Sequence, residues 1–181
     1  MPAPPPDLDT ATAGRNEWAL PASATLAAIA VATIGLDPRV VPALYLALVT
    51  PALVVADVTG RRLPNWLVLP GFPVCIAAVV AEGLQGGQLP LAAVLAGLTY
   101  FAVFLAMAWA GGMGMGDVKL AGVLGLSAGL IGVAPAVATA VVAFVLGGVA
   151  AVVSARRPDG AGIPFGPYLL AGYWVALLLA S

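Results

Sequence analysis

Charged residues and metal-binding side chains are scarce in this chain. Its 181 residues include no histidine, a single cysteine (Cys75) and only 8% charged residues. One cysteine cannot form an internal disulfide, and a zinc site would lack its usual ligands, so we expect no metal and no other cofactor. The seven lysines and arginines are scattered along a chain of net charge −1. They cannot form the basic face that binding to nucleic acid requires.

Apolar side chains, by contrast, make up 62% of the sequence. This fraction is too high for a soluble domain of this length, so the chain is expected to lie in a lipid bilayer. Residues 1–17 differ from the rest because they are rich in proline and acidic residues, which predicts a short disordered cytoplasmic tail. The predicted organisation is therefore this tail, 1–17, followed by a transmembrane domain, 18–181.

Seven apolar segments follow the tail. A helix needs about 20 residues to span the hydrocarbon core, with a lower limit near 17, so the third and fifth segments are marginal. We expect Pro70 and Pro73 to kink the third segment. The predicted fold is all-α, a polytopic membrane bundle of about seven transmembrane helices, with six as the alternative. The segments are 18–35, 40–57, 66–81, 89–110, 117–133, 136–155 and 163–180.

Basic residues gather on one side when these segments alternate across the membrane. Only Arg39 falls on the other side. The positive-inside rule makes the basic side cytoplasmic, with the N-terminus inside and the C-terminus outside. We expect Lys119 to extend toward the lipid headgroups and away from neighbouring acids. The cytoplasmic residues are Arg15 and five that we interpret as topology anchors, namely Arg61, Arg62, Lys119, Arg156 and Arg157.

Two aspartates fall at the same depth on this side. Asp57 ends the second segment, and Asp117 begins the fifth within the glycine-rich stretch GGMGMGDVKL. Carboxylates at the membrane edge are costly unless paired or hydrated, so they usually mark function. Two of them can supply the base and the acid of peptide hydrolysis, and the helix dipoles favour the shared proton on Asp57. The structural alternative is an ordinary ion pair between Asp57 and Arg61.

Three motifs in order resemble those of the type IV prepilin peptidases, membrane aspartyl proteases of the GxGD type. The stretch Asp57-Val-Thr-Gly-Arg-Arg-Leu-Pro64-Asn65 resembles the family's first aspartate motif. The stretch Gly114-Met-Gly116-Asp117-Val-Lys119-Leu120 resembles the second, GxGDxKL. The stretch Ile163-Pro164-Phe165-Gly166-Pro167 is similar to the one that opens the family's last helix.

The resemblance covers roughly residues 40–180 and implies a six-helix peptidase core preceded by one additional N-terminal helix. Larger family members carry a cytoplasmic insertion with paired CxxC motifs and also methylate the new N-terminus. This sequence contains neither feature. It therefore resembles the short, peptidase-only members of tight-adherence pilus systems, and we expect no N-methyltransferase activity.

The resemblance also implies roles for individual residues. Asp57 and Asp117 would be the catalytic pair of an aspartic endopeptidase in the inner or plasma membrane. Gly114 and Gly116 would leave room for an extended substrate backbone beside the acid. Four further positions would shape the site, because a proline-containing stretch restarts or bends a helix near it. They are Pro64 and Asn65 in the first motif, and the run Pro164, Phe165, Gly166 and Pro167 in the third.

The implied partner is a prepilin-like precursor with a short basic leader and a single apolar helix. It would be cut after a glycine at the cytoplasmic face. A small proton-coupled transporter is the alternative function, but it would place its acids near the midplane and show an inverted repeat, which the sequence does not. A packing subunit that tolerates asparagine at both aspartates is a third reading. The oligomeric state is left open.

The predicted topology can be tested by thiol labelling in a Cys75→Ala background. A cysteine introduced beside Arg61 should be protected from a membrane-impermeant thiol reagent added to intact cells. A cysteine introduced beside Gln85 should react, because that loop is expected outside. The reverse pattern of labelling would overturn the assignment of the cytoplasmic side.

Overall fold

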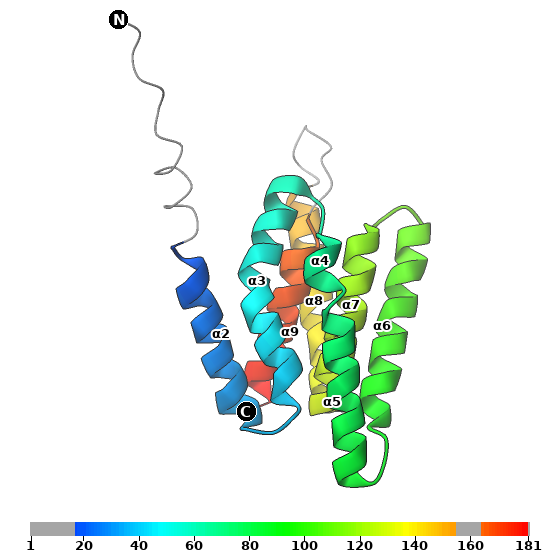
Figure 1. The fold of residues 1–181 in the computed structure, drawn as a ribbon. Coiled ribbons are helices and arrows are strands. Elements are labelled where there is room, and N and C mark those ends of the chain that lie inside the picture. The colour runs from blue at the N-terminus through cyan, green and yellow to red at the C-terminus, as the bar shows by residue number, and fades with distance from the viewer. Residues whose placement is uncertain (1–16, 155–163, 181) are drawn as a thin grey trace, which may run out of the picture.

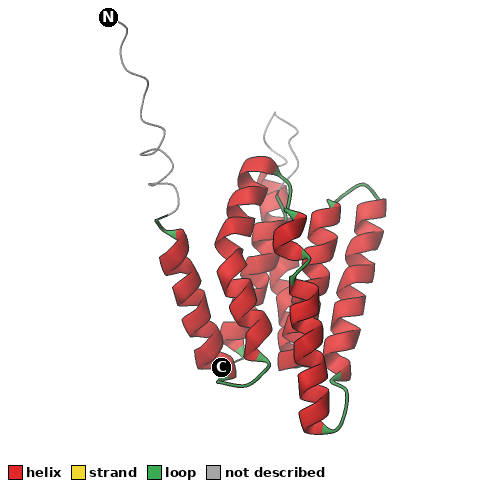
Figure 2. Ribbon diagram, in the orientation of Figure 1, coloured by secondary structure: helices red, strands yellow, loops and turns green. Residues whose placement is uncertain are grey.

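The chain folds into a bundle of helices that run alternately up and down (Figure 1). The computed structural model describes residues 17–154 and 164–180. Every regular element in these ranges is helical (Figure 2), which confirms the predicted all-α fold. Seven helices are long and α4 is a single turn. They are α2 (Ala19–Ile34), α3 (Val40–Gly60), α4 (Asn65–Val68), α5 (Gly71–Gly86), α6 (Leu91–Trp109), α7 (Met115–Ile131), α8 (Val133–Ser154) and α9 (Gly166–Leu179).

Some of the residues singled out in the sequence lie outside the described ranges. Apart from Glu17, the predicted tail 1–17 is among them. So are two of the predicted topology anchors, Arg156 and Arg157, and the first residue of the third motif, Ile163.

The helices are long and apolar enough for a membrane protein. Within the described residues, four stretches have the length and composition to cross a bilayer: α3, Asn65–Gly86 (α4 and α5 together), α6 and α8. Helices α2 and α9 are shorter and also apolar. Large side chains such as Leu95 and Leu98 of α6 and Val149 of α8 are about 60–64% exposed, and lipid would cover them. These features confirm a polytopic membrane helix bundle.

The third apolar segment is interrupted, as its prolines predict. Helix α4 ends at Val68, and α5 begins at Gly71 directly after Pro70, which has no backbone N–H to continue the ladder. The hydroxyl of Tyr45 on α3 donates a hydrogen bond to the carbonyl of Leu67 beside the break. A side chain thus satisfies a backbone group where the regular helix is lost, as a membrane interior requires.

Helix α7 is the most enclosed helix of the bundle, and its glycines explain why. A Cβ atom on Gly125 would lie 2.7 Å from the carbonyl oxygen of Ala96 on α6, and one on Gly129 would lie 2.6 Å from that of Ala92. Small residues of this kind allow two helix backbones to approach closely. The enclosed part of α7 begins after its first turn: Val118 is fully buried, whereas Asp117 is half-buried and Met115 is exposed.

Helix α9 is fixed by buried polar pairs to two neighbours. The indole N–H of Trp174 donates to the hydroxyl of Thr50 on α3 at 3.1 Å. The hydroxyls of Tyr173 and Ser127, the latter on α7, lie 2.8 Å apart. Such interhelical bonds are favourable in an apolar interior, where an unpaired hydroxyl would be costly. They set the height of α9 relative to the two helices that carry the aspartates.

An ion-pair cluster lies at the end of the bundle where α2 ends and α3 begins. The guanidinium of Arg39, just before α3, binds Asp37 at 2.8 Å and approaches Glu82 of α5 at 3.6 Å. The hydrogen bond from Arg39 holds the pKa of the Asp37 carboxyl below its usual range. This cluster connects the α2–α3 loop to the last turns of α5.

Replacement of Gly129 by alanine should destabilise the bundle, because the new methyl group would meet the backbone of α6. We expect Gly129→Ala to lower the free energy of unfolding by about 1–3 kcal/mol, the usual cost of overpacking. The matched control is Gly148→Ala on α8, where a Cβ atom meets nothing within 4 Å. That change should be neutral or gain up to about 1 kcal/mol from helix propensity. Equal stabilities of the two variants in detergent unfolding would contradict this packing.

Candidate active site

Asp57 lies in the last turn of α3, at the end of the bundle opposite the Arg39 cluster (Figure 1). The helix ends three residues later because Arg61 adopts a left-handed conformation with φ of 49° and donates its N–H to the Asp57 carbonyl. Pro64 then disfavours helix at Leu63. The Asp57 side chain is almost fully buried, with 4% of its surface exposed.

The partner of this buried carboxyl is a backbone amide. Gly166 N–H donates to Asp57 Oδ2 at 2.9 Å. Gly166 begins α9, where the first amides have no acceptor within the helix and the helix dipole is positive. The described residues give no ion pair between Asp57 and Arg61, so the interpretation of Asp57 as an ordinary surface ion pair is not supported.

Gly166 has to be glycine because of this contact. A Cβ atom at this position would lie 2.8 Å from Asp57 Oδ2 and 3.3 Å from its Cγ, closer than side chains tolerate. The sequence predicts a bend near the site from the run of Pro164 to Pro167, and the structure places the start of α9 there. The amide donor itself could not be anticipated, because nothing in the motif indicates which backbone group faces the acid.

Asp117 lies in the first turn of α7. Gly114 is the residue that caps this helix, in an extended conformation, and its carbonyl accepts the Asp117 N–H at 3.1 Å. The Oδ1 atom of Asp117 is buried and has no hydrogen-bond partner among the described residues. A buried oxygen without a protein partner is uncommon and calls for an explanation such as a catalytic role.

Both carboxyl groups line one pocket of about 280 Å³. The two aspartates thus lie at a common end of the bundle, where the alternating segments predict them. Among the described residues no cluster of three metal-ligating side chains accompanies them. Two carboxyls around a space large enough for water are the groups that acid–base hydrolysis needs. The lining is Asp57, Arg61, Arg62, Leu63, Asn65, Gly114, Met115, Gly116, Asp117 and Lys119.

The expectation for Lys119 was wrong. Its side chain lines the pocket, and its ammonium donates to Asn65 Oδ1 at 3.0 Å. The angle between Asp117 and Lys119 around α7 suggested opposite directions, but α4 packs against the start of α7 and brings Asn65 within reach of the lysine. Asn65 begins α4 after Pro64, as the first motif predicts. The Lys119–Asn65 bond therefore connects the two aspartate motifs.

Gly116 lines the pocket and also has a packing contact that the sequence did not indicate. A Cβ atom there would lie 2.9 Å from the Cβ of Leu63 and 3.4 Å from its backbone nitrogen. Because Gly116 has no side chain, Leu63 in the loop between α3 and α4 can pack against the start of α7. Gly114 fits the original expectation better, because a Cβ atom would meet Asp117 Oδ2 at 3.5 Å and otherwise only Gly116 N at 4.0 Å. The backbone beside Asp117 is open at Gly114.

Comparison with known proteins identifies the family. The profile of the type IV leader peptidase family matches residues 43–152, which include both Asp57 and Asp117. The chain belongs to the type IV leader peptidase family. This confirms the resemblance drawn from the motifs. The third motif, with Gly166, lies beyond the matched leader peptidase residues, although α9 supplies the partner of Asp57.

Two relatives are both named prepilin leader peptidase/N-methyltransferase. The protein of Bacillus subtilis (strain 168) is 30% identical over 156 residues, which are 86% of this chain and 62% of that protein. The protein of Aeromonas salmonicida (strain A449) is 31% identical over 144 residues, which are 75% of this chain and 48% of that protein. The chain thus spans less than two thirds of the length of either leader peptidase. No solved structure gives a significant match.

The close contact at Gly166 leads to a prediction for this leader peptidase family member. Gly166→Ala should displace the Asp57 carboxyl and lower peptidase activity by about 100-fold, since small shifts of catalytic groups have effects of that size. The control Gly148→Ala, which fills open space on α8, should keep wild-type activity. Cleavage rates measured at equal amounts of folded protein in membranes would test this. Full activity in Gly166→Ala would contradict a positional role for the glycine.

Proposed function

We propose that this chain is a membrane aspartyl endopeptidase that removes the short basic leader of prepilin-like precursors. The observation that carries the proposal is that Asp57 and Asp117, one from each of the two aspartate motifs, line a single pocket at one end of the bundle. Membership of the leader peptidase family and the names of the two relatives support the same activity.

The contacts of the two carboxyls suggest how the shared proton is distributed. Helix dipoles considered alone favour a proton on Asp57. However, the amide of Gly166 and the N-terminus of α9 both stabilise the carboxylate form of Asp57. Asp117 keeps a buried oxygen without a partner, an environment in which a neutral carboxyl is less costly than a charged one. We therefore assign the general base to Asp57 and the proton to Asp117.

Hydrolysis then proceeds in two balanced steps. Asp57 takes a proton from a water molecule, whose oxygen bonds to the scissile carbonyl carbon while Asp117 gives its proton to the carbonyl oxygen. In the second step the C–N bond breaks. The leaving amine receives the proton held by Asp57, and one hydroxyl of the intermediate returns a proton to Asp117. The pair regains its starting state, and the mature protein leaves with a free amine.

The pocket is proposed to open at the cytoplasmic face. Arg61, Arg62 and Lys119 line it together with the aspartates, and basic residues concentrate on the cytoplasmic side of membrane proteins. A scissile bond placed there would lie where the apolar helix of a precursor meets its leader. The open backbone at Gly114 suits a small residue before the cut, and the family resemblance implies glycine.

The position of the two acids also separates this proposal from a transporter. Asp57 and Asp117 lie at the ends of α3 and α7, whereas proton-coupled transport calls for carboxylates near the middle of the membrane. Asp117 lines a pocket that also includes exposed residues such as Arg62.

Replacement of either aspartate by asparagine should abolish cleavage. We expect Asp57→Asn and Asp117→Asn each to reduce processing of a co-expressed precursor by at least about 10⁴-fold, because base and acid act as one unit. Asp37→Asn, a loop acid at the other end of the bundle, should process normally. Mass spectrometry of the mature N-terminus should place the cut after glycine.

Membrane insertion and thermal unfolding of each variant would be measured in parallel, so that loss of folding is not mistaken for loss of chemistry. Substantial processing by either variant would rule out the proposed pair. A mature N-terminus that follows a large side chain would contradict the proposed approach at Gly114.

A further inference from the structure

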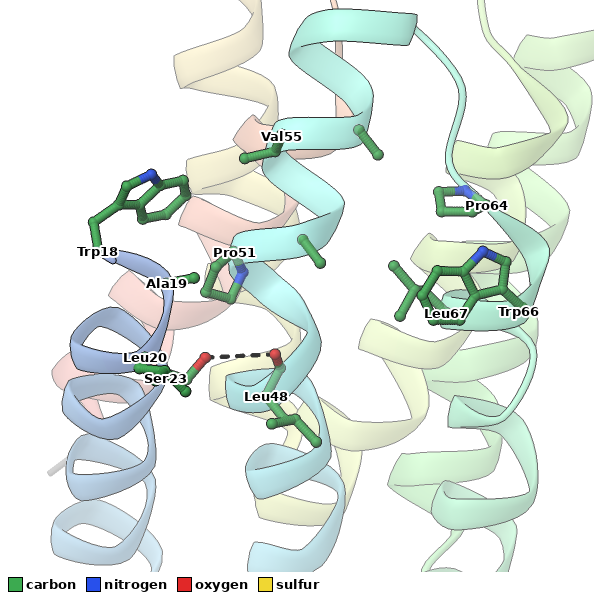
Figure 3. A pocket seen from close by; sticks show the side chains of 12 residues that line it. Trp18, Ala19, Leu20, Ser23, Leu48, Pro51, Val55, Pro64, Trp66 and Leu67 are labelled. Carbon is green, nitrogen blue, oxygen red and sulfur yellow. Dashed lines mark hydrogen bonds between the residues drawn. The ribbon is translucent and has the colours of Figure 1, made fainter. Parts of the chain in front are cut away.

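A second, larger hollow lies beside the catalytic pocket, on the outer side of α3. Its volume is about 540 Å³, and it is bounded by α2 on one side and by α4 on the other (Figure 3). We call it the α2–α4 groove. It is lined by Trp18, Ala19, Leu20, Ser23, Leu48, Pro51, Ala52, Val55, Ala56, Pro64, Trp66 and Leu67.

The groove has a floor of small side chains between aromatic walls. Ala52 and Ala56 lie one turn apart on the exposed side of α3, while Trp18 stands at the start of α2 and Trp66 on α4 (Figure 3). The indoles are 45% and 74% exposed, so each offers an apolar surface. Small residues on one helix face let a second helix approach closely within a membrane.

The side chains that line the groove do not favour a polar occupant. Ser23 is the polar side chain of the groove besides the two indoles, and its hydroxyl already donates to the carbonyl of Leu48 on α3 at 3.4 Å. None of the lining residues is charged. The groove is therefore suited to an apolar segment, in contrast to the catalytic pocket, where five of the ten lining residues are charged.

The groove and the catalytic pocket are neighbours. Ala56 of the groove precedes Asp57 of the pocket, and Pro64 of the groove stands between Leu63 and Asn65 of the pocket. From Ala56 the floor extends along α3 to Leu48, about 12 Å at the rise of an α-helix. The groove thus begins beside the segment that carries Asp57 and leads toward the middle of the membrane.

We propose that the α2–α4 groove binds the first turns of the precursor's apolar helix, antiparallel to α3 and with α2 as one wall. This inference rests on the proposed function, because it takes the occupant to be the part of the substrate that follows the cut. Other apolar hollows among the described residues are less suitable. One lies near Pro38 and Pro73, away from Asp57, and another lies on α8 between Phe144 and Val153.

Filling the groove should affect whole precursors more than short peptides. Ala52→Trp would occupy the floor five residues before Asp57. It should lower kcat/KM for a full precursor about tenfold more than for a soluble peptide that contains the leader and cut site but no apolar helix. Ala102→Trp, on the exposed side of α6, is the matched control and should change neither value.

Cross-linking supplies a second readout that does not depend on activity. Val55→Cys, combined with Asp57→Asn and Cys75→Ala, should form a disulfide with a cysteine placed in the first two turns of the precursor's apolar helix. An Ala102→Cys protein in the same background should not. This experiment also distinguishes a precursor helix from a lipid chain as the occupant of the groove.

Three outcomes would overturn the proposal: equal loss for both substrates, no loss in Ala52→Trp, or cross-links that form equally at positions 55 and 102. Failure of the underlying peptidase function would look different. In that case the wild-type protein itself would cleave neither the precursor nor the peptide.

Discussion

A single backbone hydrogen bond, from Gly166 to Asp57, connects the parts of the molecule that form the site. It joins residues 109 positions apart and lets the start of α9 act on an acid at the end of α3. The bond requires α9 to sit at one height in the bundle. The pairs Trp174–Thr50 and Tyr173–Ser127 fix that height from within the membrane. Polar pairs deep in the bundle thus position the Gly166 amide and the Asp57 carboxyl at its end.

The second acid depends on a different kind of contact. Asp117 is positioned by α7, and the glycines of α7 allow its backbone to pack closely against α6. Near the pocket, Gly116 admits Leu63, and Lys119 holds Asn65, so the two aspartate motifs are also fixed to each other. The two carboxyls therefore come from helices that are positioned by different contacts, and α9 is bonded to both helices.

The sequence is sufficient to predict the helices and the common end of the two acids. Long apolar segments must be helical in a membrane, and their alternation places Asp57 and Asp117 together. What it cannot supply is the packing between helices. The contacts of Lys119 with Asn65 and of Gly116 with Leu63 were not predicted, because α4 and its preceding loop pack against α7. The amide partner of Asp57 and the α2–α4 groove arise from tertiary packing, which no local pattern encodes.

Helix α2 stands at the edge of the bundle and contributes no residue to the lining of the catalytic pocket (Figure 1). It also precedes the residues matched by the family profile. If α2 forms one wall of the groove, recognition and hydrolysis reside on different segments of the chain. Mutation in α2 during evolution would then change which precursors are accepted while the hydrolytic centre stays under its own selection. By this route, related enzymes could come to select different precursors while keeping the same catalytic residues.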